Sequence, residues 1–524
     1  MRPMNMKTQI SKTQLLLTLM VAVTLFLTPA AFAAVPGITG PTFNLVAQQA
    51  FISQPDGQFV YSWGYGCNGA PTGFAPSAIT TATCPTMQVP GPTLIVTQGQ
   101  TVTVRLTNSL PNAAGNTSIL FPGFNVTATG GVVGLLTREA GRATTNNVVT
   151  YTFVASTPGT HVYYSGTQGD LQVEMGLYGA IVVLPSTIPA ACTSGIHTSN
   201  AMAQAHWGES DFRLAAAAYN HPEACYDREY LFQYSEMDPR IHREAEQQST
   251  RTCTGCMTVA TEPYVPAYFM INGRSMPDLM DPNYAREYPH QPYNGNPHMH
   301  PGELTLLRII GTGRWQHPFH EHGNHVRILA RDGNLILSAT DANSLAGPLL
   351  FTTTTTPGQS MDGIYYWTGK GLNWDPYGHN PASGDPNAKL ACMPDDNGYN
   401  TSAPTAINYF EWCQDHNKPL QAFPFGDVAG GGPATLPDPN IFANGPWFGG
   451  SPYLGPNATV RAVGSTGTTP PSGTVANSPT DEAGFAFMWH SHNEREITTN
   501  NIFPGGMLMM MLVDSREFVI DESN

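Results

Sequence analysis

Charged residues are scarce in this chain of 524 residues, where Asp, Glu, Lys and Arg together make up only 12%. Basic residues are the scarcer kind, with 23 Lys and Arg against 38 Asp and Glu, and the formal net charge is −15. A protein that binds the phosphate backbone of a nucleic acid needs a basic surface. The composition therefore argues against a nucleic-acid partner.

Long apolar runs are also missing, apart from one short segment near the N-terminus. Lys7 and Lys12 precede an apolar segment from Leu15 to Leu27, which a small-residue triplet ending at Ala33 follows. The segment is shorter than the roughly 18 residues of a membrane-spanning helix, and the order of features is typical of a secretory signal peptide. We expect cleavage of residues 1–33 and a secreted or periplasmic product that keeps no membrane span.

Glycine and proline, in contrast, are abundant, with 52 Gly and 45 Pro, which favours many turns between short strands. The two halves of the chain repeat one another in the same order, and a duplicated β-sandwich explains this better than one large sheet. We therefore predict an all-β protein with two sandwich domains. The corresponding segments are 99–106 and 302–309, 163–166 and 489–492, and 179–183 and 506–513.

The predicted domain order is a first domain at 34–189, a linker at 190–225 and a second domain at 226–524. Within the second domain the strand pattern stops at about 368–482, where Pro, Gly, Asn and Asp are dense. A structureless segment of this length is unusual inside a compact domain, so we predict an insertion, with a small third domain as the alternative. The insertion would form a substrate or partner surface, or a passive flap.

Eight cysteines in an exported chain indicate disulfides. Proximity in the sequence pairs Cys67 with Cys84, Cys192 with Cys225, and Cys392 with Cys413, and leaves Cys253 and Cys256 for a small local bridge. A redox role for this Cys-x-x-Cys motif is disfavoured because no βαβ pattern surrounds it.

Histidines cluster in two places. Between His317 and Gly323 the sequence is His-Pro-Phe-His-Glu-His-Gly, and His490-Ser-His492 follows the apolar run 485–489. Side chains alternate along a strand, so His320 and His322 share one face. Two such pairs on adjacent strands would present four imidazoles to a metal. The alternative is a set of polar histidines at strand ends, hydrogen-bonded to each other and to the backbone.

Both histidine segments resemble motifs of multicopper oxidases. The segment from His317 to Gly323 is similar to the His-Pro-x-His-x-His-Gly signature, and His490-Ser-His492, followed by Gly505-Gly-Met507, is similar to the closing His-Cys-His segment. The segments 90–108 and 176–180 resemble the opening and the end of the family's first domain. The resemblance implies cupredoxin-like Greek-key sandwiches, copper as the cofactor, a blue copper centre that oxidises substrate and a trinuclear cluster that reduces oxygen.

The sequence departs from this family where the copper ligands should be. Ser491 stands in place of the blue-copper cysteine, and the nearest candidates for the second blue-copper histidine are Glu494 and Glu496. A hydroxyl cannot replace a soft thiolate ligand. In the first domain, both expected His-x-His pairs are missing, in the segments 117–123 and 164–166. We therefore expect no blue copper centre and no complete trinuclear cluster within one chain.

The remaining histidines lead to three hypotheses for function. The first is a copper-binding protein with a reduced, histidine-only site. The second is a copper-dependent oxidoreductase that acts on a small reductant with oxygen, either using this site directly or with its cluster completed across the subunits of a homo-oligomer. The third is a structural or interaction module that kept the fold. The candidate metal ligands are His320, His322, His490 and His492, with His317 as a peripheral ligand.

Neighbouring polar residues add weaker candidates. Glu321, Glu494 and Glu496 would orient the ring N–H groups of the ligands, or face solvent. The segment His298-Met-His300 would be a surface copper ligand set or an ordinary loop. No Ser/His/Asp group, phosphate-binding loop or carboxylate pair stands out as a catalytic motif.

Overall fold

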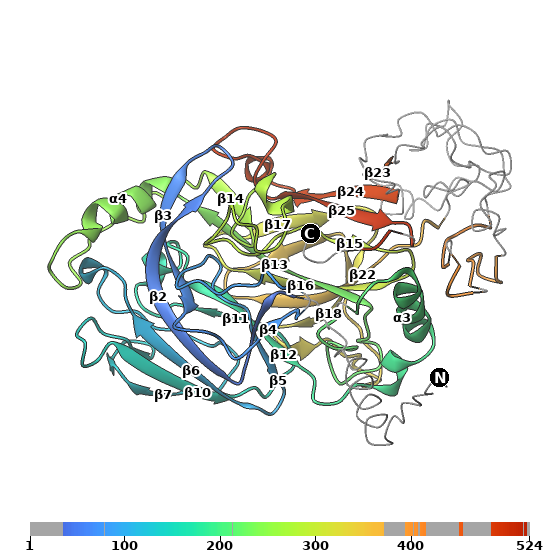
Figure 1. Ribbon diagram of the computed structural model, residues 1–524, viewed down its shortest axis with the longest axis horizontal. Coiled ribbons are helices and arrows are strands. Elements are labelled where there is room, and N and C mark those ends of the chain that lie inside the picture. The colour runs from blue at the N-terminus through green and yellow to red at the C-terminus, as the bar shows by residue number, and fades with distance from the viewer. Residues whose placement is uncertain are drawn as a thin grey trace, which may run out of the picture.

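The computed structural model describes residues 35–370, 394–414, 450–453 and 484–520, apart from the single positions 78, 212, 402, 407, 408 and 517. The predicted signal segment 1–33, Cys392 and most of the predicted insertion lie outside these residues. Figure 1 shows two stacks of strands side by side, the first formed by the N-terminal part of the chain and the second by the C-terminal part.

The first stack consists of two five-stranded sheets. Along β6, Val102, Val104 and Leu106 are buried while the residues between them are more exposed, as expected for a strand with one face on the core. One sheet has the order β11 (Gly159–Tyr164), β12 (Tyr178–Leu184), β5 (Leu94–Thr97), β1 (Gly37–Thr39) and β4 (Phe74–Ala75). The other has the order β3 (Phe59–Cys67), β2 (Thr42–Ser53), β6 (Thr101–Asn108), β10 (Val148–Val154) and β7 (Thr127–Gly130).

The second stack pairs a seven-stranded sheet with a six-stranded sheet around a core that contains Phe319, Trp489 and Met509. The larger sheet has the order β14 (Tyr268–Ile271), β13 (Arg228–Met237), β16 (Leu304–Gly311), β22 (Ser360–Tyr366), β18 (Val326–Arg331) and β19 (Asn334–Leu335), with β20 (Leu349–Leu350) beside β18. The smaller sheet has the order β15 (His298–Met299), β25 (Leu508–Asp514), β24 (Gly484–Ser491), β17 (His317–Glu321) and β21 (Thr352–Thr355), with β23 (Gly450–Tyr453) beside β24.

Short elements connect the two sandwiches and their strands. Two strands of two residues each form the β8–β9 hairpin. The two longer helices, α3 and α4, lie outside the sheets (Figure 1). The elements are β8 (Val132–Val133), β9 (Arg138–Glu139), α2 (Gly169–Gln172), α3 (Ile196–Trp207), α4 (Pro239–Ser249), η1 (Asn112–Ala114), η2 (Ala190–Thr193), η3 (Asp278–Met280) and η6 (Glu494–Ile497). No helix in the described part of the chain combines the length and the apolar character that a membrane span requires.

The all-β, two-sandwich prediction is confirmed, and the strands of the two sandwiches occupy residues 37–184 and 228–514. The segment 43–61, whose alternation of residues is typical of a single strand, belongs to two strands, β2 and β3, that a turn at Gly57 separates, where φ is +82°. Helix α4 was not predicted, although Asp238 accepts a hydrogen bond from the Arg240 backbone and Pro239 starts the helix, a common N-terminal signal.

Three of the predicted disulfides are present: Cys67–Cys84, Cys192–Cys225 and Cys253–Cys256. The first two close loops of 17 and 33 residues, so they restrict the unfolded chain. The predicted partner of Cys413 lies outside the described residues.

A buried polar contact joins the two sandwiches. The Thr160 backbone N–H and hydroxyl both donate to the Asp362 carboxylate, at 3.0 and 2.6 Å, and the Ser360 hydroxyl donates to the Thr160 carbonyl at 2.5 Å. Both Thr160 and Asp362 are almost fully buried. This contact fixes β11 of the first sandwich against β22 of the second.

Thr160→Ala should therefore destabilise the protein by about 1–3 kcal/mol, because a hydrogen bond to a buried charged group is lost. Urea unfolding monitored by fluorescence measures the change. Thr152→Ala is the matched control, since Thr152 is half-buried on β10 within the first sandwich, and it should change stability by at most about 0.5 kcal/mol. Equal losses in the two variants would contradict the role of the inter-sandwich contact.

Candidate metal centre

Strands β17 and β24 lie side by side and antiparallel, and they bring the two histidine segments together. His320 lies directly opposite His490 in this pairing, and the His492 backbone N–H donates to the Pro318 carbonyl at 2.8 Å. Phe319 and Trp489 point to the opposite face, into the core of the second sandwich. The alternation of apolar and histidine residues thus places the imidazoles on the outer face of the smaller sheet.

Four imidazole rings converge on this face. Ring centroids are 4.7 Å apart for His320 and His322, 4.8 Å for His320 and His492, and 5.8 Å for His320 and His490. The His490 ring lies 5.1 Å from that of His322 and 5.2 Å from that of His492. The structure therefore brings together all four residues that the two His-x-His motifs single out.

Hydrogen-bond partners at Nδ1 orient two of the four rings, His490 and His320. Nδ1 of His490 lies 2.8 Å from the Ser491 carbonyl oxygen, which can only accept, so this nitrogen carries a proton. Nε2 of the neutral His490 ring then has a lone pair, and it lies 3.3 Å from Nε2 of His322. On the other side, Nδ1 of His320 contacts the Thr352 hydroxyl at 3.0 Å.

The cluster disfavours protonation. Burial, together with the neighbouring rings of the cluster, lowers the pKa of His320 to about 4. Burial also lowers the pKa of His490. Both rings are therefore neutral at pH 7, which is the form that binds a metal.

The cluster is open to solvent on one side. His320, His322 and His490 are buried, whereas His492 is exposed. The exposed ring of Phe351 packs edge-on against His320, with centroids 5.6 Å apart. An ion can thus approach from the side of the exposed His492 ring and reach the three buried rings behind it.

His317, the predicted peripheral ligand, does not join this cluster. It faces the core side of β17, where its Nε2 lies 2.8 Å from the Glu236 carboxylate and its Nδ1 lies 2.9 Å from the Glu496 carboxylate. The Ser491 hydroxyl donates to the same Glu496 oxygen at 2.5 Å. We call Glu236, His317 and Glu496 the buried triad. Since both ring nitrogens of His317 are bound to carboxylates, we leave it out of the candidate metal site.

The glutamates expected to orient the cluster lie elsewhere. Glu496 belongs to the buried triad, and Glu494 is exposed on η6. Glu321 points into the core and accepts a hydrogen bond from the Thr353 hydroxyl, and burial raises its pKa to about 8. Thr352 and the Ser491 carbonyl contact the imidazoles in their place, and neither was predicted from the sequence.

Residues 75–187 match the family model of multicopper oxidases. This range falls within the first sandwich, which holds the segment 90–108 and the segment 176–180 that suggested the resemblance. The first sandwich thus carries a match to a multicopper oxidase domain. The match confirms the resemblance seen in the motifs, and it implies copper as the cofactor.

Solved structures of copper proteins are similar to the chain as well. A multicopper oxidase, mgLAC, is 14% identical, with 92% of this chain and 88% of that chain covered and a TM-score of 0.44. A blue copper oxidase from Nitrosomonas europaea is 15% identical, with 90% and 85% covered and a TM-score of 0.42. A copper nitrite reductase from the same organism is 18% identical, with 63% and 85% covered and a TM-score of 0.38. No curated protein sequence matches the chain.

The chemistry of the donors in the second sandwich suits the copper that the multicopper oxidase match implies, but within the described residues no three of the four histidines place ring nitrogens within 4.8 Å of one another. Imidazole nitrogens are good ligands for copper, and the rings of His320 and His490 are held neutral. The His322 and His490 nitrogens, 3.3 Å apart, are close enough to share one ion. His320, His322, His490 and His492 would hold the ion.

The buried triad should make the stability of the protein depend on pH. Burial alone would lower the pKa of His317, but the hydrogen bonds and charges of Glu236 and Glu496 raise it to about 9. The unfolded histidine has a pKa of about 6.5. The stabilisation is thus fully present below about pH 6.5 and is lost as the pH rises through about 9.

We expect the urea midpoint of the copper-free protein to fall between pH 7 and pH 9.5. His317→Gln should remove most of this fall, because glutamine does not titrate. An unchanged midpoint across this range in the unsubstituted protein would contradict a protonated His317.

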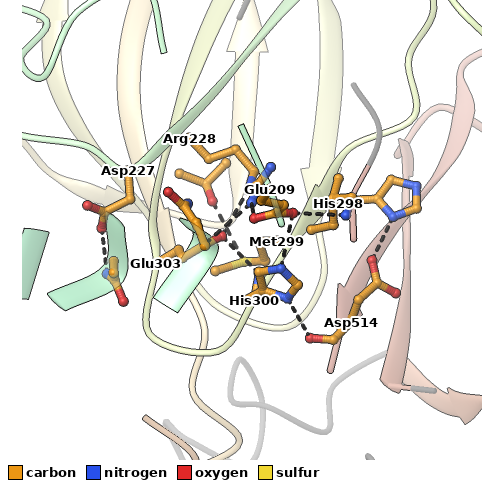
Figure 2. A network of polar contacts seen from close by, with 12 residues as sticks. Glu209, Asp227, Arg228, His298, Met299, His300, Glu303 and Asp514 are labelled. Atoms are coloured by element: carbon orange, nitrogen blue, oxygen red, sulfur yellow. Dashed lines mark hydrogen bonds and ion pairs between the residues drawn. The ribbon is translucent and has the colours of Figure 1, made fainter. Parts of the chain in front are cut away.

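The segment His298-Met-His300, predicted to lie on the surface, is buried in a second polar network (Figure 2). His298 pairs with Asp514 at 2.7 Å, and His300 pairs with Glu209 at 3.2 Å. Figure 2 shows the network linking the connecting segment before β13, the loop before β16 and the C-terminal segment. The segment can be buried because buried histidines need hydrogen-bond partners, and Glu209 and Asp514 supply them.

Glu209, His300 and Glu303 place ligand-type atoms within 4.8 Å of one another. The Arg228 guanidinium, however, bridges both carboxylates, at 3.0 Å from Glu209 and 2.9 Å from Glu303. Arg516 also lies 3.8 Å from Glu303. A cation here would face two fixed positive charges, so we interpret the network as a structural connection.

Proposed function

We propose that this chain is an exported, multicopper-oxidase-like protein that binds a single copper ion through four imidazoles and has no blue copper centre. The observation that carries the proposal is the convergence of His320, His322, His490 and His492 on one face of the smaller sheet. The low pKa of His320 supports it, because a ring that stays neutral remains a ligand.

The surroundings of Ser491 support the absence of a blue copper centre. The hydroxyl of Ser491 donates to Glu496, and Glu496 also binds His317, which is the one histidine that the multicopper oxidase resemblance leaves of the blue copper ligands. No cysteine follows Cys413 in the sequence. A protonated imidazole and two carboxylates thus occupy the place where the resemblance puts a thiolate-bound copper.

The chain's own residues define what the site can do. The paired strands β17 and β24 fix three rings in position, and Thr352 and the Ser491 carbonyl hold the ring orientations. Exposed His492 leaves one side open to small molecules. Copper bound by imidazoles supplies a one-electron redox couple. A site of this kind suits copper binding and transfer, or electron exchange with a small reductant.

Copper loading of the purified mature protein tests this proposal. After excess Cu(II) is added and removed on a desalting column, elemental analysis should find about one copper per chain, as expected for one set of imidazole ligands. Oxygen uptake with a panel of small reductants then separates a copper-binding protein from a copper-dependent oxidoreductase. A product without retained copper would contradict both.

A further inference from the structure

A cavity of about 340 Å³ lies between the two sandwiches. Leu120, Val162 and Tyr164 line it from the first sandwich, and Thr312 and Pro357 line it from the second. The walls are mostly apolar. Ligand-binding cavities in proteins have volumes of roughly 300–1,000 Å³ and this kind of lining, so the cavity is large enough for a small molecule.

The cavity occupies the position in the first sandwich that corresponds to the histidine face in the second. Leu120 pairs with Tyr164 in an isolated antiparallel bridge, as His320 pairs with His490 across β17 and β24. The positions in the first sandwich that correspond to His320 and His490 are thus occupied by Leu120 and Tyr164. None of the four clustered histidines lines the cavity.

One polar group in the cavity wall has no partner among the described residues. The Tyr164 hydroxyl makes no hydrogen bond there, and a side chain on Gly358, another lining residue, would lie 3.6 Å from it. The hydroxyl groups of the other polar lining residues are already used: Ser165 donates to Gln172 at 2.7 Å, and Thr312 donates to the Tyr234 carbonyl at 2.8 Å. A ligand would meet mostly apolar walls, one free hydroxyl donor and the paired guanidinium of Arg314.

Arg314 is the charged residue among those that line the cavity, and it is already paired. The Arg314 guanidinium binds Glu262 at 2.7 Å and the Thr261 carbonyl at 3.1 Å, and it stacks over Tyr264. A charged ligand would therefore lose its hydration without gaining a counter-ion, which is unfavourable.

We propose that this cavity binds a small, neutral, mostly aliphatic molecule with one carbonyl or ether oxygen, which accepts a hydrogen bond from the Tyr164 hydroxyl. The apolar walls favour a ligand with a mostly apolar surface. The single hydroxyl donor favours one hydrogen-bond acceptor on that ligand. This site is separate from the copper site, so binding should be the same with and without copper.

Camphor, a neutral bicyclic ketone, is a suitable probe, and camphor-10-sulfonate is its charged counterpart. Titration of the full mature chain by isothermal calorimetry or ligand-observed NMR should show saturable binding of camphor. Binding of the sulfonate should be at least about tenfold weaker, because Arg314, the one cation in the lining, is already neutralised by Glu262. No saturable binding of camphor, or equal binding of both probes, would overturn the proposal.

Two neighbouring leucines provide a matched pair of variants. Leu136 lines the cavity mouth, whereas Leu135 is 93% exposed on the same hairpin and does not line it. Leu136→Asp should weaken camphor binding about tenfold by placing a charge beside the ligand, and Leu135→Asp should leave it unchanged. Equal effects of the two variants would contradict the location of the site.

Tyr164→Phe tests the hydrogen bond itself without changing the shape of the wall. We expect camphor binding to weaken about three- to tenfold, as for loss of one neutral hydrogen bond, while the apolar part of the site is kept. An unchanged affinity would overturn the role of Tyr164. His490→Ala should bind camphor normally even though it loses copper, so failure of either proposal is distinguishable from failure of the other.

Discussion

His490→Ala should abolish stoichiometric copper binding. The His490 ring contacts all three other rings of the cluster, it lies opposite His320 in the sheet, and its Nε2 is 3.3 Å from that of His322. Changing residues that merely support a metal ligand costs about 10–100-fold in affinity, so removal of a ligand from a four-ligand set should cost at least about 100-fold. Metal analysis after desalting, and competition with a chelator of known affinity, measure the loss.

His325→Ala is the control for this experiment. His325 is half-buried, and its ring packs against Phe351, the same aromatic residue that contacts His320. It therefore shares the neighbourhood of the cluster without belonging to it. This variant should retain copper at the level of the unsubstituted protein. If His490→Ala also retained it, the four rings would not be the binding site.

His317→Leu should cause the largest loss of stability among single substitutions near the site, about 3–5 kcal/mol, as for removal of one partner from a buried ion pair. All three side chains of the buried triad are fully buried. Without the imidazolium, Glu236 and Glu496 would be left as two negative charges in the core. Urea unfolding of the copper-free protein at pH 6 measures the effect.

Neutralising the carboxylates provides the test of this explanation. The triple variant Glu236→Gln, His317→Leu, Glu496→Gln removes both charges and keeps side-chain oxygens that accept the Arg314 and Trp315 backbone N–H groups at 2.6 and 2.8 Å. It should recover more than half of the stability lost in His317→Leu. A triple variant less stable than the single one would show that the loss comes from packing and not from charge.

Much of the histidine cluster could be predicted from sequence because it depends on strand periodicity. His320 and His322 are two residues apart, as are His490 and His492, and each pair follows apolar residues that fix which face is buried. The same alternation of side chains along a strand could have excluded His317 from the cluster. It is three residues from His320, so its side chain points to the opposite face of β17.

The partners of these residues could not be predicted, because they come from distant parts of the chain. Glu236 reaches His317 from the end of β13, and Glu209 reaches His300 from the segment between α3 and β13. The cavity likewise depends on how two sandwiches pack together, which no local pattern encodes. Helix α4, in contrast, had a visible start signal at Asp238-Pro239.

Electron paramagnetic resonance of the copper-loaded protein, combined with its optical spectrum, tests the central claim most directly. A single Cu(II) coupled to imidazole nitrogens, without intense blue thiolate absorption, is the predicted result, and it should be absent from His490→Ala. An intense thiolate band, or a copper signal without imidazole coupling that survives in His490→Ala, would contradict the account.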